Sequence, residues 1–454
     1  MPDAVAWATL RTLSEQLQRG EVQAADLVEA ALARIDAADT PDGPVFLRRF
    51  DSEARREALA VDNARARGEA VSPWAGIPFA VKDLFDVSGH VTHAGAVATR
   101  DDPPARHDAT VVAALRQAGL IPVGATNMTE FAFSGIGINP HYGTPEAAPW
   151  PGERRAPGGS SSGAGVSVAR QMVPLSLGTD TAGSCRIPAA WNNVVGLKPS
   201  QSRVSRDGVF PLSTTLDAPG PLAQSADCCR IADALMRGVM PAPAPSASLS
   251  AFRFIAPVGD RLPPLDDDVA EHYRAALQQL EDAGATVVEQ PAPAFEQAAE
   301  AFLSRPIAGY EAWLVHRDRL AARGGEYDPN VAARLRAGAN VDPAEHARTV
   351  AERRHVADAF RADTPPKTVH LLPTTANTPP SIDALARDND LFAKQNLRAL
   401  VYTSIANYLD GCALSLPIGR GVGLSLIGPS GTDDALFDAA EAVEHVLSRS
   451  RSTP

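Results

Sequence analysis

The sequence has no long hydrophobic run, and this shortage excludes the commonest kind of membrane protein. Of its 454 residues 44% are hydrophobic, yet no stretch reaches the roughly 18 consecutive apolar residues of a membrane-spanning helix. The first twenty residues carry acidic side chains in an amphipathic pattern, not the basic and then apolar order of a signal peptide. These features predict a cytoplasmic protein without a membrane partner.

Cysteine and net positive charge are also scarce. The four cysteines, Cys185, Cys228, Cys229 and Cys412, lack the spacing of a zinc site, and the adjacent pair is a poor framework for disulfides. The net charge of −12 argues against nucleic acid as the main partner, because phosphate binding needs clustered basic side chains.

Lysine is rare as well, with four lysines against 38 arginines. Lys82 stands in the apolar stretch "GIPFAVKDLF". A buried lysine loses affinity for its proton and can act as a general base, whereas arginine stays protonated. The alternative is a packed aliphatic stem whose ammonium pairs with Asp83 or Asp86.

Helices alternate with strands along the whole chain. In both 108–127 and 267–289 a helical pattern, a glycine stop and an apolar strand follow one another. This alternation predicts an α/β fold, a single large domain whose mixed, twisted sheet is covered by helices on both faces. Within 1–454 we expect N-terminal helices at 1–70, a core at 71–235, a connection at 240–250 and a helical substrate-shaping region at 295–362.

The segment "APGGSSSGAG", residues 156–165, has three possible uses. A phosphate-binding loop would need a lysine after its glycines, and none follows. A nucleophile elbow centred on Ser161 would need a preceding buried strand and a partner such as His370 or His445. The third reading is a flexible polar loop.

The segment "GTDTAGS", residues 178–184, favours a catalytic function. It follows an apolar strand, and consecutive backbone N–H groups in such a turn can converge on one anion. Ser184 directly follows this turn and is therefore placed like a nucleophile. A serine hydroxyl needs a base, and Lys82 is the best candidate.

The chain resembles the amidase signature family of serine amidohydrolases. The resemblance rests on "GIPFAVKD", "PGGSSSGAG", "LGTDTAGSCRIPAAWNNVVGLKPS" and "RVSRDGVFPLSTTLDAPGPLAQS". It implies a catalytic triad of Ser184 as nucleophile, Ser160 as bridging serine and Lys82 as base, with no metal and no cofactor. It also implies a cis bond before Ser160.

The resemblance further implies an oxyanion hole made by the backbone amides of Thr181, Ala182, Gly183 and Ser184. Ser162 and Ala182 stand where most members have glycine. Cys185, next to the nucleophile, lines the substrate pocket or packs in the core.

The predicted activity is hydrolysis of an amide or carbamate C–N bond by a monomer or homodimer. The alternative is the glutaminase subunit of a tRNA-dependent amidotransferase. Its motif commonly has Gln where Ile187 stands here.

Substrate choice is expected to depend on the segments 131–143 and 295–362. The motifs contain no isolated arginine that must bind a substrate carboxylate, although Arg203 or Arg206 could do so. We therefore expect a neutral, moderately hydrophobic substrate such as an aryl amide or a urethane. The expected apolar wall includes Phe302, Tyr310, Trp313 and Leu314.

Overall fold

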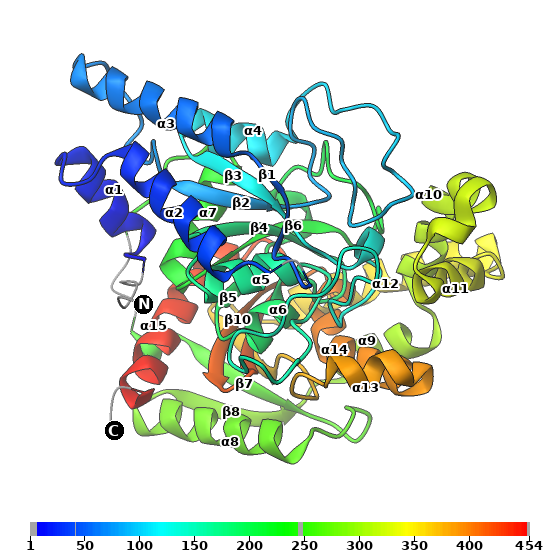
Figure 1. Ribbon diagram of the computed structural model, residues 1–454. Coiled ribbons are helices and arrows are strands. Elements are labelled where there is room, and N and C mark those ends of the chain that lie inside the picture. Colours follow the sequence, from blue (N-terminus) through cyan, green and yellow to red (C-terminus); the bar gives the residue numbers. More distant parts are fainter. Residues whose placement is uncertain (1–6, 41, 244–247, 452–454) are drawn as a thin grey trace.

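The computed structural model describes residues 7–40, 42–243 and 248–451, and eleven strands in it form one mixed sheet at the centre of the molecule (Figure 1). The strand order is β1-β3-β2-β4-β6-β5-β10-β11-β9-β7-β8. The strands are β1 (Phe46–Arg49), β2 (Pro78–Lys82), β3 (Ile121–Thr126), β4 (Leu175–Asp180), β5 (Val195–Lys198), β6 (Ala218–Ala223), β7 (Arg253–Val258), β8 (Thr286–Pro291), β9 (Thr368–Pro373), β10 (Cys412–Gly419) and β11 (Val422–Gly428).

The pairing of the strands divides the sheet into an N-terminal and a C-terminal part. β2 runs parallel to both β3 and β4, and β7 runs parallel to both β8 and β9. The remaining pairs are antiparallel, and the β5–β10 pair joins the two parts, with Leu414 opposite Leu197.

Helices cover both faces of this sheet. They are α1 (Leu10–Gln18), α2 (Ala24–Ala38), α3 (Asp51–Ala66), α4 (Thr110–Gln117), α5 (Ser162–Ala169), α6 (Arg186–Trp191), α7 (Ala226–Met236), α8 (Asp267–Asp282), α9 (Pro293–Ser304), α10 (Ile307–Arg323), α11 (Pro329–Gly338), α12 (Pro343–Asp363), α13 (Ile382–Arg387), α14 (Asn389–Tyr408) and α15 (Asp433–Arg451). The prediction of an α/β fold with a mixed sheet covered on both faces is confirmed. Of the predicted connection at 240–250, residues 244–247 lie outside the described part, as do residues 1–6.

Strand β2 shows how the sheet separates two hydrophobic cores. Phe79 and Val81 belong to the larger core, with residues of α1, α4, α7 and α15. Ala80, between them, belongs to a second core with residues of α2 and α5. Because successive side chains of a strand point to opposite faces, Lys82 shares the face of Ala80 and is directed towards α5.

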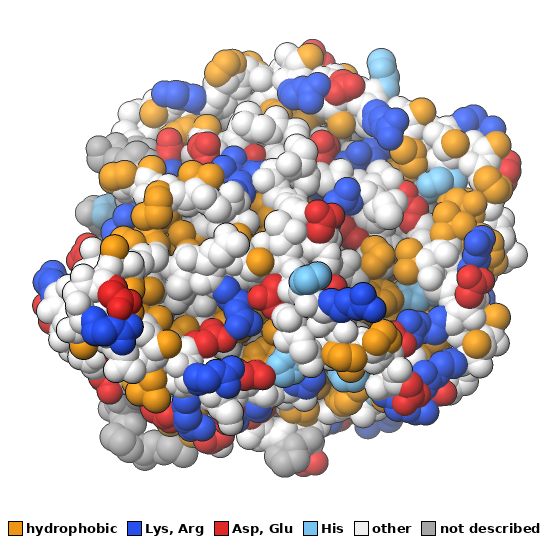
Figure 2. Space-filling view, turned by 90° about the horizontal axis from the view of Figure 1, so that it is seen from above, with side chains coloured by type: hydrophobic (Ala, Val, Ile, Leu, Met, Phe, Trp, Pro, Cys, Tyr) orange, Lys and Arg blue, Asp and Glu red, His pale blue; other side chains and the backbone are white. Residues whose placement is uncertain are grey.

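The helices α10 and α11 form a projection at the rim of the molecule, on the right in Figure 1. Buried Glu311 of α10 connects this projection to the core, since its carboxylate accepts hydrogen bonds from the hydroxyls of Ser213 and Thr215. On the face seen from above, acidic and basic side chains are interspersed (Figure 2).

Candidate active site

Three polar segments meet where β2 and β4 end. These two strands are parallel neighbours, so their carboxyl ends open on the same edge of the sheet. Lys82 is the last residue of β2, Ser160 comes just before α5, and Ser184 follows β4 after a short turn. The structure thus brings together the segments that the sequence singled out.

Lys82 is fully buried and makes two side-chain contacts. Its Nζ lies 2.7 Å from the Oγ of Ser160 and 2.8 Å from the Oγ1 of Thr179, both at hydrogen-bonding distance. Burial lowers the pKa of Lys82 to about 7, against a weaker opposing effect of buried acidic groups such as Asp217. Lys82 does not pair with Asp83, whose carboxylate is held by Arg48. The contact with Thr179 was not predicted.

The three consecutive serines differ in their surroundings. The Gly159–Ser160 peptide bond is cis, as the resemblance implied. Ser161 donates to the carbonyl of Thr179 at 3.3 Å, and the hydroxyl of Ser162 is buried without a partner among the described residues. Gly159 is needed for packing, because a Cβ there would lie 2.5 Å from the backbone nitrogen of Gly137.

The turn after β4 presents free backbone amides. Within the described residues, the N–H groups of Thr181, Ala182 and Ser184 have no protein acceptor, whereas that of Gly183 donates to the carboxylate of Asp180 at 2.8 Å. The Ser184 hydroxyl makes no hydrogen bond to Ser160 or to any other described residue. Ser184 is only 4% exposed, and it lines a cavity.

A buried ion pair holds this turn in place. Arg186 donates to both carboxylate oxygens of Asp180, at 3.0 and 2.9 Å, and to Asn407 of α14 at 2.6 Å. Although burial alone would raise the pKa of Asp180, the neighbouring guanidinium keeps it below its usual value. The sequence patterns did not single out this network, which ties the turn to a helix more than 200 residues further along.

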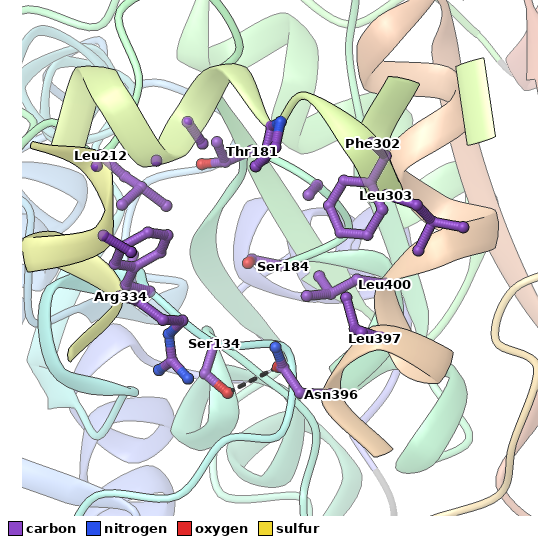
Figure 3. Close-up of a pocket in the computed structure, with 18 of the residues that line it drawn as sticks. Ser134, Thr181, Ser184, Leu212, Phe302, Leu303, Arg334, Asn396, Leu397 and Leu400 are labelled. Atoms are coloured by element: carbon purple, nitrogen blue, oxygen red, sulfur yellow. Dashed lines mark hydrogen bonds between the residues drawn. The ribbon is translucent and has the colours of Figure 1, made fainter. Parts of the chain in front are cut away.

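The cavity beside Ser184 has a volume of about 310 Å³ and is mostly apolar (Figure 3). Ser184 lies between an apolar side, with Phe302, Leu303 and Leu400, and a polar corner. The cavity is lined by Ala132, Phe133, Ser134, Thr181, Ala182, Ser184, Leu212, Phe302, Leu303, Pro306, Ala308, Gly309, Arg334, Ala337, Gly338, Val341, Asn396, Leu397 and Leu400.

Ser134, Arg334 and Asn396 form the polar corner of the cavity (Figure 3). No acceptor for the guanidinium of Arg334 is found among the described residues, and its Nε and Nη2 are buried. The guanidinium carbon lies 5.5 Å from the ring centre of Phe133 and 5.7 Å from that of Phe392. Burial lowers the pKa of Arg334 to about 10, so this side chain remains a cation at neutral pH.

The residues proposed from the sequence to shape the substrate pocket differ in their positions. Phe302 lines the cavity, but Tyr310, Trp313 and Leu314 do not. Arg203 is paired with Asp233, and Arg206 lines a different hollow. Of the two alternatives for Cys185 the structure favours packing, because this thiol is fully buried and does not line the cavity.

The described residues contain neither a metal-binding cluster nor a membrane-spanning helix. No group of three or more His, Cys, Asp or Glu side chains that could hold a metal ion occurs in them. None of the helices in that part of the chain is both long and apolar enough to cross a membrane.

The fold, the motif segments and their meeting point identify the family. A profile of the amidase family matches residues 26–437, and the chain belongs to this family. It is an amidase-signature hydrolase that acts on C–N bonds.

Several known proteins are similar over most of the chain. A 2-amino-5-chloromuconic acid deaminase of Comamonas testosteroni is 33% identical over 97% of this chain and 96% of its own. A 1-carboxybiuret hydrolase subunit of Pseudomonas sp. (strain ADP) is 40% identical over 69% and 70%. A glutamyl-tRNA(Gln) amidotransferase subunit of Pseudomonas entomophila is 32% identical over 96% and 97%. A crystal structure of an amidase superposes with a TM-score of 0.86 at 30% identity, covering 96% of this chain and 99% of the other.

Proposed function

We propose that this hydrolase cleaves a C–N bond of a small amide, carbamate or urea that bears a carboxylate, through an acyl-enzyme on Ser184. The desolvated Lys82 in hydrogen-bonding contact with Ser160, next to a serine that lines a cavity, carries the proposal. Thr181 also lines this cavity beside free backbone amides, but its hydroxyl donates to the buried carboxylate of Asp217 at 2.5 Å, whereas that of Ser184 has no partner among the described residues.

In the proposed mechanism the two serines and the lysine move one proton. Neutral Lys82 accepts the proton of Ser160, which accepts the proton of Ser184 as the Ser184 oxygen attacks the substrate carbonyl. The proton then returns through Ser160 to the departing nitrogen, the C–N bond breaks, and water hydrolyses the ester left on Ser184.

The turn after β4 would stabilise the negative charge of the tetrahedral intermediate. The amides of Thr181, Ala182 and Ser184 are free to donate to the oxyanion. The amide of Gly183, also predicted for this function, already donates to Asp180. Its contribution is therefore to hold the turn, and the hole consists of the other three amides.

Arg334 is the reason for proposing an anionic substrate. Its Nε and Nη2 are buried and have no acceptor among the described residues, which is costly for a cation, and a bound carboxylate would supply the missing acceptors. The names of two relatives also contain a carboxyl group, one as a muconic acid and one as a carboxybiuret. The expectation of a neutral substrate, drawn from the sequence, did not take Arg334 into account.

Two other substrate classes have some support. The apolar lining favours a neutral aryl amide or urethane. The similarity to amidotransferase subunits favours glutamine. However, no Asp or Glu is among the described residues that line the cavity, so the ammonium group of free glutamine would lack a counter-charge there.

The acyl-enzyme is tested by trapping it with an activated aryl ester or carbamate. Intact-protein and peptide mass spectrometry should find the acyl group on Ser184, and S184A should take up none. S162A is the matched control, because the Ser162 hydroxyl has no hydrogen-bond partner in the described part of the chain. Stable labelling of a residue other than Ser184, or turnover by S184A near the wild-type rate, would refute the assignment.

The anionic substrate is tested with R334M and a pair of amides. Succinamate carries a carboxylate that butanamide lacks, and both present a primary amide to Ser184. Loss of a charge-assisted contact should lower kcat/KM for succinamate roughly 30- to 100-fold and leave butanamide within about threefold. R336M, on the exposed side of α11, is the control. An equal loss on both amides, or a wild-type preference for butanamide, would favour the neutral substrate class.

A further inference from the structure

We infer that Asn396 makes the polar corner of the cavity selective for a carboxylate over the isosteric carboxamide, by presenting its NH2 group beside Arg334. The inference rests on the proposed function, whose substrate class it narrows. It concerns binding, and can therefore be tested without turnover.

The orientation of the Asn396 side chain is set by its neighbours. Its Oδ1 accepts the backbone N–H of Gly135 at 2.8 Å and the hydroxyl of Ser134 at 2.9 Å. A backbone N–H can only donate, so the atom facing it must be the carbonyl oxygen of the amide. The Ser134 oxygen in turn accepts the N–H of Ile136 at 3.2 Å, which directs the Ser134 proton to Asn396.

With its oxygen held on both sides, the amide turns its NH2 group away from the loop. Asn396 is 8% exposed and lines the cavity, and its Nδ2 makes no hydrogen bond to any described residue. In Figure 3 the Nδ2 lies on the cavity side of the hydrogen bond to Ser134.

The backbone of Gly135 makes this arrangement possible. A Cβ at position 135 would lie 2.8 Å from the Cγ of Leu400 on α14. A larger residue would therefore force either the loop or the Leu400 side chain to move.

Arg334 and Asn396 consequently both present donors to the corner. Arg334 supplies N–H groups and a positive charge, and Asn396 supplies a neutral NH2. A carboxylate places acceptors against both. A carboxamide of the same shape has to set its own NH2 against one of the two donors, which leaves buried polar groups unpaired. Arg334 selects the sign of the charge, and Asn396 adds discrimination between two groups of equal size.

The experiment compares benzoate with benzamide, which have the same planar shape and an apolar ring suited to the lining. Binding is measured by calorimetry on wild type and on S184A, so that it does not depend on chemistry at Ser184. Wild type and S184A should bind benzoate at least tenfold more tightly than benzamide. N396D should reduce benzoate affinity roughly 30-fold or more, because a carboxylate would face the ligand's carboxylate, and should leave benzamide within about threefold.

Two further variants make the result decisive. N389D introduces the same charge at an exposed site of α14 and should keep the wild-type preference. S134A removes the hydrogen bond from the Ser134 hydroxyl to the Asn396 Oδ1. It should weaken the preference for benzoate without reversing it. Equal binding of the two ligands by wild type, an unchanged preference in N396D, or no benzoate binding at all would each overturn the inference. Absence of Ser184 acylation would instead overturn the proposed function, and leaves the binding result unaffected.

Discussion

At the scale of single residues, two buried lysines show how partners decide the function of one side chain. Lys198 donates to the carbonyls of Pro199 and Gly411 at 2.8 and 2.7 Å, and carbonyls can only accept. Lys82 instead contacts the hydroxyls of Ser160 and Thr179, which can either donate or accept. Neutral Lys82 can therefore accept a hydrogen bond, and a proton, from a hydroxyl partner, whereas the carbonyl partners of Lys198 have no proton to give.

The pKa of Lys82 predicts the pH dependence of the activity. Because burial lowers this pKa to about 7, the neutral base accumulates as the pH rises through 7. We expect kcat to rise about tenfold per pH unit below 7 and to level off above 8, which a pH–rate profile from pH 5 to 10 would reveal. A maximum near pH 5 would contradict this prediction.

The same group predicts a difference in stability. The unfolded chain holds the Lys82 proton up to the ordinary lysine pKa of 10.5, and the folded chain releases it near 7. Between these values the unfolded state binds the extra proton, so this contribution to the free energy of unfolding increases with pH. In K82M that increment should be missing.

At the scale of elements, the sequence predicted those strands that follow a helix and a glycine stop directly in the chain. Strand β6 was missed, because Pro219 and Pro221 argue against a central strand. Both prolines lie opposite residues of β4, but β6 pairs with β5 only at Leu222 and Ala223. No ladder bond to β5 is therefore required of either proline.

The polar corner of the cavity was also missed, although its sequence signal exists. In α11, Arg334 lies three residues after buried Val331 and four before buried Gly338, and so shares their face. In α14, Asn396 follows buried Phe392 by four residues. A polar residue in a buried stripe is a recognisable anomaly, but what it faces depends on how two distant helices pack, and periodicity does not report that.

At the scale of the whole molecule, the two parts of the sheet contribute different portions of the site. Lys82, Ser160 and Ser184 come from the N-terminal part, which carries the motifs that could be recognised in the sequence. Arg334 and Asn396 come from the C-terminal part and reach the cavity only through the assembled sheet. Local patterns therefore predicted which segments meet at the cavity, including 131–143 and 295–362, which supply much of its lining. They did not predict that Arg334 and Asn396 would face it.

This division predicts how a split protein behaves. The fragment 1–243 would retain Lys82, Ser160 and Ser184, but it would expose the edge of β5 that pairs with β10 and part of the core that both halves share. Produced alone, it should aggregate and show no activity, because an open edge strand above an uncovered core associates with other chains.

Produced together with the fragment 248–454, the fragment 1–243 should be soluble and active. The β5–β10 pair, with Ala413 opposite Lys198 and Ser415 opposite Gly196, and the shared core should bring the two fragments into one complex. Co-elution in size-exclusion chromatography and recovery of amide hydrolysis are the measurements, with the S184A version of the pair as the blank. Hydrolysis by 1–243 alone would show that the N-terminal part folds and binds substrate by itself. In that case Arg334 and Asn396 could not be the residues that hold the substrate.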